Sequence, residues 1–396
     1  MTRVNAAAAS PPTLDARTRR LLVLVAAVVL VDTSFYASIT PLLPRYVETL
    51  ALSKTEAGVL SGSYAAGTLL GSIPGGWAAS RLGARPVLLA GLGLMSAAGV
   101  VFALGPGLLV LDLARFAQGV GGAASWAAAL TWLVLVAPTE RRGELIGVAL
   151  GAAIAGALLG PVVGGAADLL GPGPVFTFVA LVGVALAAFA LTVASPTRGE
   201  PSSAGGLAAT LRSRPAVAAM ALVALPALVF GVVGVLAPLR LDELGASGVA
   251  IGATFLVGAG IEAVISPLVG RVSDRRGRWV PLRVGLVLAA ATVPLLALPD
   301  GRWLLSLGVV VVAASLGTFW APAMALLSER AEALGLALGV AFGLSNLAWA
   351  SGQVVGAAGG ARLAEATADA VPYALVGLLC LMALLATLRR TPARPT

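Results

Sequence analysis

Three charged side chains, Asp32, Arg115 and Glu262, lie inside long apolar segments of this 396-residue chain. An ionised group at the centre of a lipid bilayer costs about 2.5 to 3.5 kcal/mol even on a lenient insertion scale, so each of the three needs a reason to be there. A carboxylate can take up and release a proton, whereas a guanidinium keeps its charge and can only bias a neighbouring carboxylate or an anion. The three residues therefore predict proton coupling in apolar surroundings.

Asp32 lies in the run V-D-T-S-F-Y-A-S-I-T-P-L-L-P, in which Thr33, Tyr36 and Ser38 supply further polar groups. Removal from water favours the neutral form of a lone carboxylate, which suits the binding and release of a proton. In the alternative interpretation, Asp32 is permanently ionised and pairs with Arg115 only to hold two helices together.

Arg115 lies in the run R-F-A-Q-G-V-G-G, with Gln118 one turn away on the same face and with glycines that allow another helix to approach. It could tune a nearby carboxylate, or it could be a structural clamp that Asp112 neutralises locally. Glu262 has Thr68 as its counterpart in the first half of the chain. It is expected to line a cavity from the second half, unless it pairs with a polar partner in the core.

Polar and aromatic side chains in the same apolar segments complete the candidate substrate cavity. Some of them could equally form ordinary hydrogen bonds between helices. The predicted cavity residues are Asp32, Tyr36, Tyr64, Gln118, Trp126, Glu262, Trp320, Asn346, Trp349 and Gln353.

The composition identifies lipid as the main solvent of the chain, since 59% of the residues are hydrophobic and only 11% are charged. Spanning segments in lipid must satisfy their own backbone hydrogen bonds, which predicts helices. The chain has no histidine and a single cysteine, Cys380, so neither a metal site, a cofactor, an internal disulfide nor an enzyme active site is expected. Its basic residues are not clustered on a polar surface, which argues against nucleic acid as a partner.

An internal repeat relates the two halves of the chain. Displaced by 194 residues, Pro44 falls on Pro238, Gly58 on Gly252 and Gly83 on Gly277. We therefore predict an all-α membrane protein with twelve transmembrane helices in two six-helix pseudo-repeats. The predicted spans are 20–44, 55–79, 85–104, 108–135, 144–168, 174–194, 216–238, 249–271, 279–298, 303–327, 334–360 and 371–388.

The repeat also predicts the domains: an N-terminal bundle with its tail over 1–195, a cytoplasmic linker over 196–215 and a C-terminal bundle over 216–396. With the N-terminus inside, twenty of the 26 basic residues lie on the cytoplasmic side, which satisfies the positive-inside rule. We expect a monomer in the bacterial cytoplasmic membrane with both termini in the cytoplasm.

A glycine stripe in the predicted fifth span reads G-A-L-L-G-P-V-V-G-G, from Gly156 to Gly165. Glycines four residues apart permit close contact with another helix, and Pro161 removes a backbone hydrogen bond. The stripe thus comprises Gly156, Gly160, Pro161, Gly164 and Gly165.

These motifs resemble those of the major facilitator superfamily over nearly the whole chain. The glycine stripe resembles that family's antiporter signature, which implies a proton-tight hinge in an exporter. The segment of Arg115, Gln118 and Gly119 resembles a second signature, associated with proton coupling. P-L-L-P at residues 41–44 resembles the twelve-span drug:proton antiporter branch, and Asp32 resembles the first-span carboxylate by which vesicular amine transporters contact the ammonium of their substrate.

The family's loop signature G-x-x-x-D-R-x-G-R implies a cytoplasmic gate, latched by its carboxylate against a helix N-terminus. In the first half Ser80 occupies the carboxylate position, which leaves Asp274 to hold the gate against the start of the fifth helix. The alternative is that these residues only fix topology and turns. The gate residues that match are Gly76, Arg81, Gly83, Arg85, Gly270, Asp274, Arg275, Gly277 and Arg278.

Together these features predict proton-coupled efflux of small lipophilic molecules by alternating access, with cations favoured if Asp32 meets the cargo in its ionised form. The expected partners are protons, the cargo and the lipid bilayer. An alternative is the efflux of sugars or other neutral metabolites, with Trp126, Trp320 and Trp349 as stacking contacts. A sensor is a third possibility, but it would need a soluble output domain, for which no loop is long enough.

Overall fold

In a computed structural model of the chain, the described residues are 14–138, 141–194, 213–333 and 338–389, and they form helices and turns without a strand. The predicted tail and most of the predicted linker 196–215 lie outside these ranges. The first half contains α1 (Ala16–Ala37), η1 (Thr40–Leu42), α2 (Leu43–Leu50), α3 (Lys54–Leu82), α4 (Ala84–Leu104), α5 (Leu108–Val136), α6 (Arg142–Leu170) and α7 (Pro172–Thr192). The second half contains α9 (Arg214–Glu243), α10 (Gly248–Arg276), α11 (Trp279–Thr292), η3 (Pro294–Ala297), α12 (Arg302–Ala333), α13 (Leu338–Val354), the π-helical turn η4 (Val355–Gly359), α14 (Gly360–Ala366) and α15 (Ala370–Leu388).

Ten helical segments among the described residues are long and apolar enough to cross a membrane. They correspond to ten of the twelve predicted spans, whereas the spans 55–79 and 334–360 fall in α3 and in α13 to α14, which do not meet the same criteria. Small residues of α3 explain its lower hydropathy: a Cβ added at Gly67, Gly71 or Gly75 would meet the backbone of α5. The count of twelve spans therefore stays a prediction.

The repeat is visible in how the helices begin and end. Ser53 caps α3 and Ser247 caps α10, each accepting a hydrogen bond from the backbone N–H three residues on. The same two helices end at Gly83 and Gly277, whose φ angles of 99° and 83° lie in the left-handed region that favours glycine. Both pairs are 194 residues apart, so the sequence repeat corresponds to a repeat of local structure.

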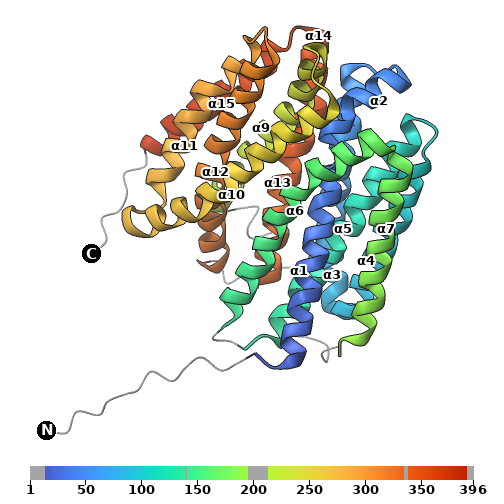
Figure 1. The fold of residues 1–396 in the computed structure, drawn as a ribbon. Coiled ribbons are helices and arrows are strands. Elements are labelled where there is room, and N and C mark those ends of the chain that lie inside the picture. The colour runs from blue at the N-terminus through green and yellow to red at the C-terminus, as the bar shows by residue number, and fades with distance from the viewer. Residues whose placement is uncertain (1–13, 139–140, 195–212, 334–337, 390–396) are drawn as a thin grey trace, which may run out of the picture.

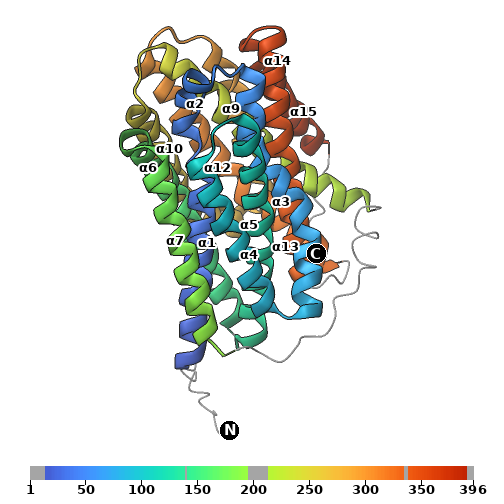
Figure 2. The ribbon, with the colours of Figure 1, turned by 90° about the vertical axis from the view of Figure 1, so that its right-hand side faces the viewer.

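Each half encloses its own apolar core, and the outer surface is apolar as well. One core extends through α9 to α15, a second lies in the first half, and a third lies mainly in the first half but includes Val235, Leu239, Ala357 and Ala361 of the second. Large apolar side chains such as Leu109, Phe178 and Val264 are about two-thirds exposed, as expected of a surface that contacts lipid tails. Figure 2 shows α1, α4, α5 and α7 of the first half running side by side.

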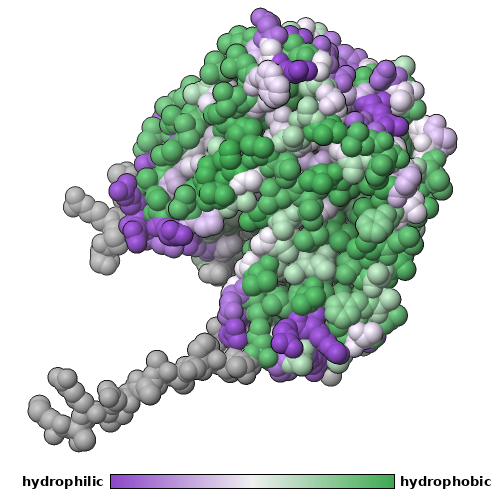
Figure 3. All heavy atoms as spheres, in the orientation of Figure 1, coloured by the Kyte–Doolittle hydropathy of each residue, from purple (hydrophilic) through white to green (hydrophobic). Residues whose placement is uncertain are grey.

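The two halves meet at one end of the molecule and separate at the other (Figures 1 and 3). At the end called here the closed end, α3 contacts α14 through Gly58 and Ala361, and α6 contacts α10 through Pro161 and Gly252. The opposite, open end contains the turns at Gly83 and Gly277, and Figure 3 shows a notch between the halves there. The predicted cytoplasmic loops therefore lie at the open end.

Candidate functional site

The carboxylate of Asp32 is buried between three helices of the first half. Asp32 lies on α1 and is only 6% exposed, and the hydroxyl of Tyr64 on α3 donates a hydrogen bond of 2.5 Å to its Oδ1. Gly122 on α5 provides the space, because a Cβ at that position would collide with the carboxylate and with the tyrosine hydroxyl. Trp126, one turn further along α5, faces the same carboxylate, but its Nε1 makes no hydrogen bond of acceptable geometry.

Arg115 is fully buried and fastens the end of α1. Its Nη1 donates to the carbonyl oxygen of Phe35 at 2.8 Å and its Nη2 to that of Tyr36 at 3.0 Å. These carbonyls belong to the last turn of α1, where a cation is favourable because the helix no longer supplies donors. Nη1 also contacts Oε1 of Gln118 at 3.3 Å. The geometry is that of a clamp between α5 and α1.

Asp32 and Arg115 do not form an ion pair; Tyr64 links them instead. The guanidinium lies over the Tyr64 ring, 5.0 Å from its centroid, while the hydroxyl of the same ring bonds to Asp32. Asp112 does not neutralise the arginine either, because its Oδ1 accepts a hydrogen bond of 3.4 Å from Ser63. The direct Asp32–Arg115 pair that the sequence left open is therefore absent in this conformation.

An aromatic group adjoins the buried carboxylate and crosses between the halves. The ring centroids of Tyr36 and Tyr64 lie 5.4 Å apart, and those of Tyr36 and Trp349 lie 5.0 Å apart in a T-shaped arrangement. Trp349 belongs to α13 in the second half, whereas both tyrosines belong to the first. The structure thus places a carboxylate and three aromatic rings at the junction of the two halves.

Glu262 lies apart from this cluster, on α10. Its side chain lies against Gly317 of α12, on the face of α10 opposite to the exposed Val257 and Val264. The carboxylate makes no hydrogen bond or ion pair with any described residue, so the core partner weighed from the sequence is not found there. Thr68, its first-half counterpart, bonds back to the carbonyl of Tyr64 and is a packing residue.

Several predicted cavity residues are buried with polar atoms that lack a partner. They are Nε2 of Gln118, which is 0% exposed, Oε1 of Gln353, which is 4% exposed, and Nε1 of Trp126. Such atoms are rare in folded proteins and are normally satisfied by water or by a ligand. Asn346 is half-buried on α13, and Trp320 packs against the core of the second half.

The glycine stripe on α6 is the surface against which α1 packs. Added Cβ atoms at Gly156, Gly160 and Gly164 would collide with α1 or with the residues directly after it. The next two positions of the predicted hinge face the other half, since the carbonyl of Pro161 lies near Gly252 and Gly165 lies near Val249 of α10. The hinge residues thus contact both halves.

The predicted gate residues lie at the open end, and the contacts given below join them to residues of their own half. Ser80 donates to the Trp77 carbonyl of its own helix, and the Asp274 carboxylate makes no hydrogen bond or ion pair with the part of the chain that the structure describes. Arg278 binds the carbonyl of Ala325 at 3.0 Å and pairs with Glu329. The remaining gate residues include Arg81, which stacks on Trp77, and Arg85, which bonds to the carbonyl of Leu191, beside Gly76, Gly83, Gly270, Arg275 and Gly277.

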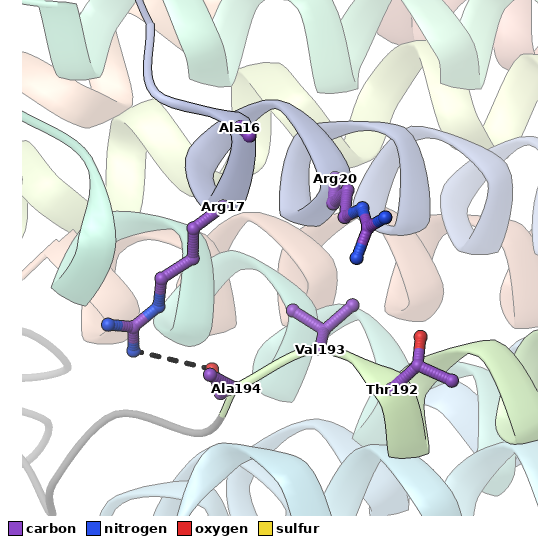
Figure 4. A pocket seen from close by; sticks show the side chains of 6 residues that line it. All are labelled: Ala16, Arg17, Arg20, Thr192, Val193 and Ala194. Atoms are coloured by element: carbon purple, nitrogen blue, oxygen red, sulfur yellow. Dashed lines mark hydrogen bonds between the residues drawn. The ribbon is translucent and has the colours of Figure 1, made fainter.

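Two surface cavities at the open end are distinct from the buried cluster. One of about 250 Å³ lies between the start of α1 and the end of α7, where Arg17 reaches the carbonyl of Ala194 at 3.4 Å (Figure 4). The other, of about 410 Å³, adjoins Asp274 and Arg278. Among the described residues no group of three or more His, Cys, Asp or Glu side chains could hold a metal ion.

Sequence reasoning missed two contributors to the site. Gly122 is one, although the run of glycines after Arg115 indicated a close helix approach; only the fold shows that the approaching group is the Asp32 carboxylate. Phe102 of α4 is the other, with its ring 5.9 Å from the guanidinium of Arg115. Nothing in an isolated phenylalanine within an apolar segment indicates such a role.

Comparisons with known proteins agree with this architecture. The model of the Major Facilitator Superfamily matches residues 22–357 of the chain. Among solved structures, a D-xylose-proton symporter aligns with a TM-score of 0.77 at 20% identity, covering 95% of this chain and 98% of that one. A bacterial homologue of the human lysosomal transporter Spinster, inward-facing and occupied, aligns with a TM-score of 0.75 at 17% identity over 94% and 96% of the two chains. These likenesses show the fold.

Curated relatives match at low identity. The MFS-type transporter ppzB of Metarhizium rileyi is 31% identical over 150 residues, which are 37% of this chain and 31% of the relative. The synaptic vesicular amine transporter of Homo sapiens is 24% identical over 85% of this chain and 66% of its own length. The match to YcaD, an MFS-type transporter of Salmonella newport, is 27% identical over 96% and 97% of the two chains. The match to ppzB, like those to a ppzB of Metarhizium majus and to a probable anion transporter of Oryza sativa, spans only about a third of the relative's length. The helical membrane fold and the family match together show that the chain belongs to the Major Facilitator Superfamily and is a transporter.

Proposed function

We propose that the chain is a proton-coupled exporter of small lipophilic cations. Its two six-helix halves, with twelve spans in total, would rock about the buried cluster in the bacterial cytoplasmic membrane, with both termini in the cytoplasm. The notch at the open end then corresponds to a state that faces the cytoplasm.

The observation that carries the proposal is the state of Asp32. Its carboxylate is 6% exposed, accepts a hydrogen bond from a neutral tyrosine and forms no ion pair. A buried ionised carboxylate without a counterion is unfavourable, so the site requires either a proton on Asp32 or a cation beside it. These two ligands therefore exclude each other, which is the requirement for exchange.

The exchange balances charge and protons. In the inward-facing state a cationic cargo binds beside Asp32, the carboxyl group releases its proton to the cytoplasm, and the cation takes the place of that proton. In the outward-facing state a proton from outside binds the carboxylate and the cargo leaves. Tyr64 can donate its hydrogen bond throughout, and the rings of Tyr36, Tyr64 and Trp349 offer an apolar, cation-compatible wall.

The test is substrate-induced proton release by the purified protein in detergent, with a cationic dye as the probe. The parent should release protons when the dye is added, and Asp32→Asn should not. Asp112→Asn is the matched control, because it removes a carboxylate of the neighbouring helix that bonds only to Ser63. Glu262→Gln tests whether the second-half carboxylate contributes. Unchanged proton release in both Asp32→Asn and Glu262→Gln would refute the proposed site.

A second candidate, the efflux of sugars, rests on the unpartnered polar atoms of Gln118, Gln353 and Trp126, which could bind hydroxyl groups. Proteoliposomes separate the two functions when a cationic dye and a labelled sugar are each supplied with and without an imposed pH gradient. Gradient-driven movement of the sugar, but not of the dye, would favour this second function.

A further inference from the structure

The closed end contains two contacts of the same kind, each between a carboxylate of one half and the first turn of a helix in the other. The backbone N–H of Thr55 in α3 donates to Oε2 of Glu365 in α14 at 2.6 Å. The carboxylate of Asp168, near the end of α6, lies against Gly248, the first residue of α10, in space that a Cβ would fill, but it accepts no hydrogen bond from the described backbone of α10. Both contacts cross from one half to the other.

The internal repeat relates these two contacts. Lys54 and Gly248 are the first residues of α3 and α10, and they lie 194 positions apart. In each case the carboxylate comes from the last turn before the end of the partner helix, which is Leu170 for α6 and Ala366 for α14. Backbone N–H groups in a first helical turn lack partners within the helix, and the helix dipole there favours negative charge. A carboxylate therefore faces a helix N-terminus in both places, through a hydrogen bond at Thr55 and through proximity alone at Gly248.

A third polar contact reinforces the α3 side. Nζ of Lys54 lies 2.7 Å from Oδ1 of Asp369, which precedes α15 in the second half. Other ion pairs at this end remain within one half: Arg45 approaches Asp168 at 3.9 Å, and Arg240 pairs with Glu243 at 2.9 Å. Such pairs move with their own half and cannot oppose separation of the halves.

We propose that Glu365 and Asp168 form a two-point latch that holds the closed end shut and sets the equilibrium between the two faces of the transporter. The latch rests on the alternating access of the proposed function, but it requires neither a particular cargo nor titration of Asp32. When the closed end opens, both carboxylates leave their helix N-termini and return to water. Each such contact is worth about a two- to fivefold change in the equilibrium, so loss of both should shift it by about four- to twenty-five-fold.

The test measures the opposite end of the ligand-free protein, so that a local effect of the substitution does not register. Spin labels are attached at Leu82→Cys on α3 and Arg276→Cys on α10, both exposed at the open end, after the single native cysteine has been replaced by Cys380→Ala. Electron–electron distance measurements then report how far apart the halves lie at that end.

The parent should show mainly the long label distance of the open end. Glu365→Ala and Asp168→Asn should each add a population with a shorter distance, and the double variant should increase it further. Glu365→Gln should be intermediate because it keeps an acceptor oxygen but loses the charge. Glu243→Ala is the matched control, since it removes a closed-end carboxylate that pairs within its own half, and it should leave the distances unchanged.

A second readout uses Lys54, the only lysine of the chain. Its acylation in membranes, followed by mass spectrometry, should be faster in the double variant Glu365→Ala/Asp168→Asn than in the parent or in Glu243→Ala. Label distances and Lys54 reactivity that match the parent in this double variant would overturn the latch. The two proposals can fail separately. The label distances and Lys54 reactivity test the latch, whereas dye-induced proton release tests the proposed function.

Discussion

Helix α6 carries two glycine runs with the same spacing, one packed against α1 and the other without close neighbours. Substitutions in the two runs therefore test, within a single helix, how much the close packing of α1 depends on glycine. Gly156, Gly160 and Gly164 face α1, and a Cβ at Gly160 would collide with the Cβ of Ala37. Gly143, Gly147 and Gly151 have nothing within 4 Å of an added Cβ. Alanine at Gly160 or at Gly151 therefore adds the same atom to two different environments.

The expected difference in stability follows from these surroundings. Both substitutions gain the helix propensity of alanine over glycine, about 0.5 to 1 kcal/mol, so this gain cancels in the comparison. What remains is the overpacking against α1, about 1 to 3 kcal/mol. We expect thermal unfolding in detergent to show Gly160→Ala less stable than Gly151→Ala by that amount, with Gly151→Ala as stable as the parent or slightly more so.

Transport adds a second comparison. Gly143, Gly147 and Gly151 continue, towards the open end, the face of α6 on which Leu158 and Gly165 approach α10. When the halves close at that end, this bare surface should meet the second half. Gly151→Leu should then slow dye transport while the protein stays folded. Equal stability of Gly160→Ala and Gly151→Ala, or undiminished transport by Gly151→Leu, would refute the reasoning.

Two further predictions concern Arg115 and Glu365. Arg115→Lys keeps the charge but cannot reach both α1 carbonyls, so thermal unfolding should show a loss of about 1.5 to 3 kcal/mol, the value of one charge-assisted hydrogen bond. Arg115→Gln should not be rescued by Asp32→Asn; a rescue would show that the two charges compensate each other. Hydrogen bonding to Thr55, with Ser53 and Arg362 nearby, lowers the pKa of Glu365. The ionised form therefore favours the closed end at every pH above the ordinary glutamate range near about 4.3, and this contribution is lost as the pH falls through the lowered value. The label distances at the open end should stay constant from about pH 8 to about pH 5 as far as Glu365 is concerned, and a shift at lower pH should be smaller in Glu365→Ala.

Much of the architecture could be predicted because lipid imposes simple rules on sequence. Apolar runs predicted ten segments that the structure also identifies, and the 194-residue repeat has a counterpart in the caps at Ser53 and Ser247, which were not predicted. The predicted span 334–360 is missing from these ten because α13 has only 17 described residues and is followed by the π-helical turn η4. The predicted span 55–79 is missing for a different physical reason. In α3, glycines stand where α5 approaches closely, and glycine is less hydrophobic than a bulky apolar residue. A criterion based on hydropathy therefore does not identify α3 as a span.

Sequence patterns predicted which residues belong to the candidate site, but not which of these residues contact one another. Asp32, Tyr64, Arg115 and Gln118 were all selected for their polarity, yet polarity does not tell which groups bond to one another. Tyr64 emerged as the link between the two charges because a glycine at position 122 lets α5 approach. The contacts that join Glu365 and Asp168 to the other half were not predicted, because carboxylates at helix ends are common. Their partners, Thr55 and Gly248, lie 310 and 80 positions away in the sequence.

The anchoring of α1 fixes one part of the buried cluster to the first half, whereas another part belongs to the second. Its last carbonyls are held by Arg115 and its flank is seated on the glycines of α6, so Asp32 and Tyr36 are fixed to the first half. Trp349 belongs to the second half, and its ring forms a T-shaped pair with that of Tyr36. In the proposed exporter, the carboxylate that would bind the cation is therefore held rigidly by the first half, whereas the ring of Trp349 would shift against Tyr36 whenever the second half moves.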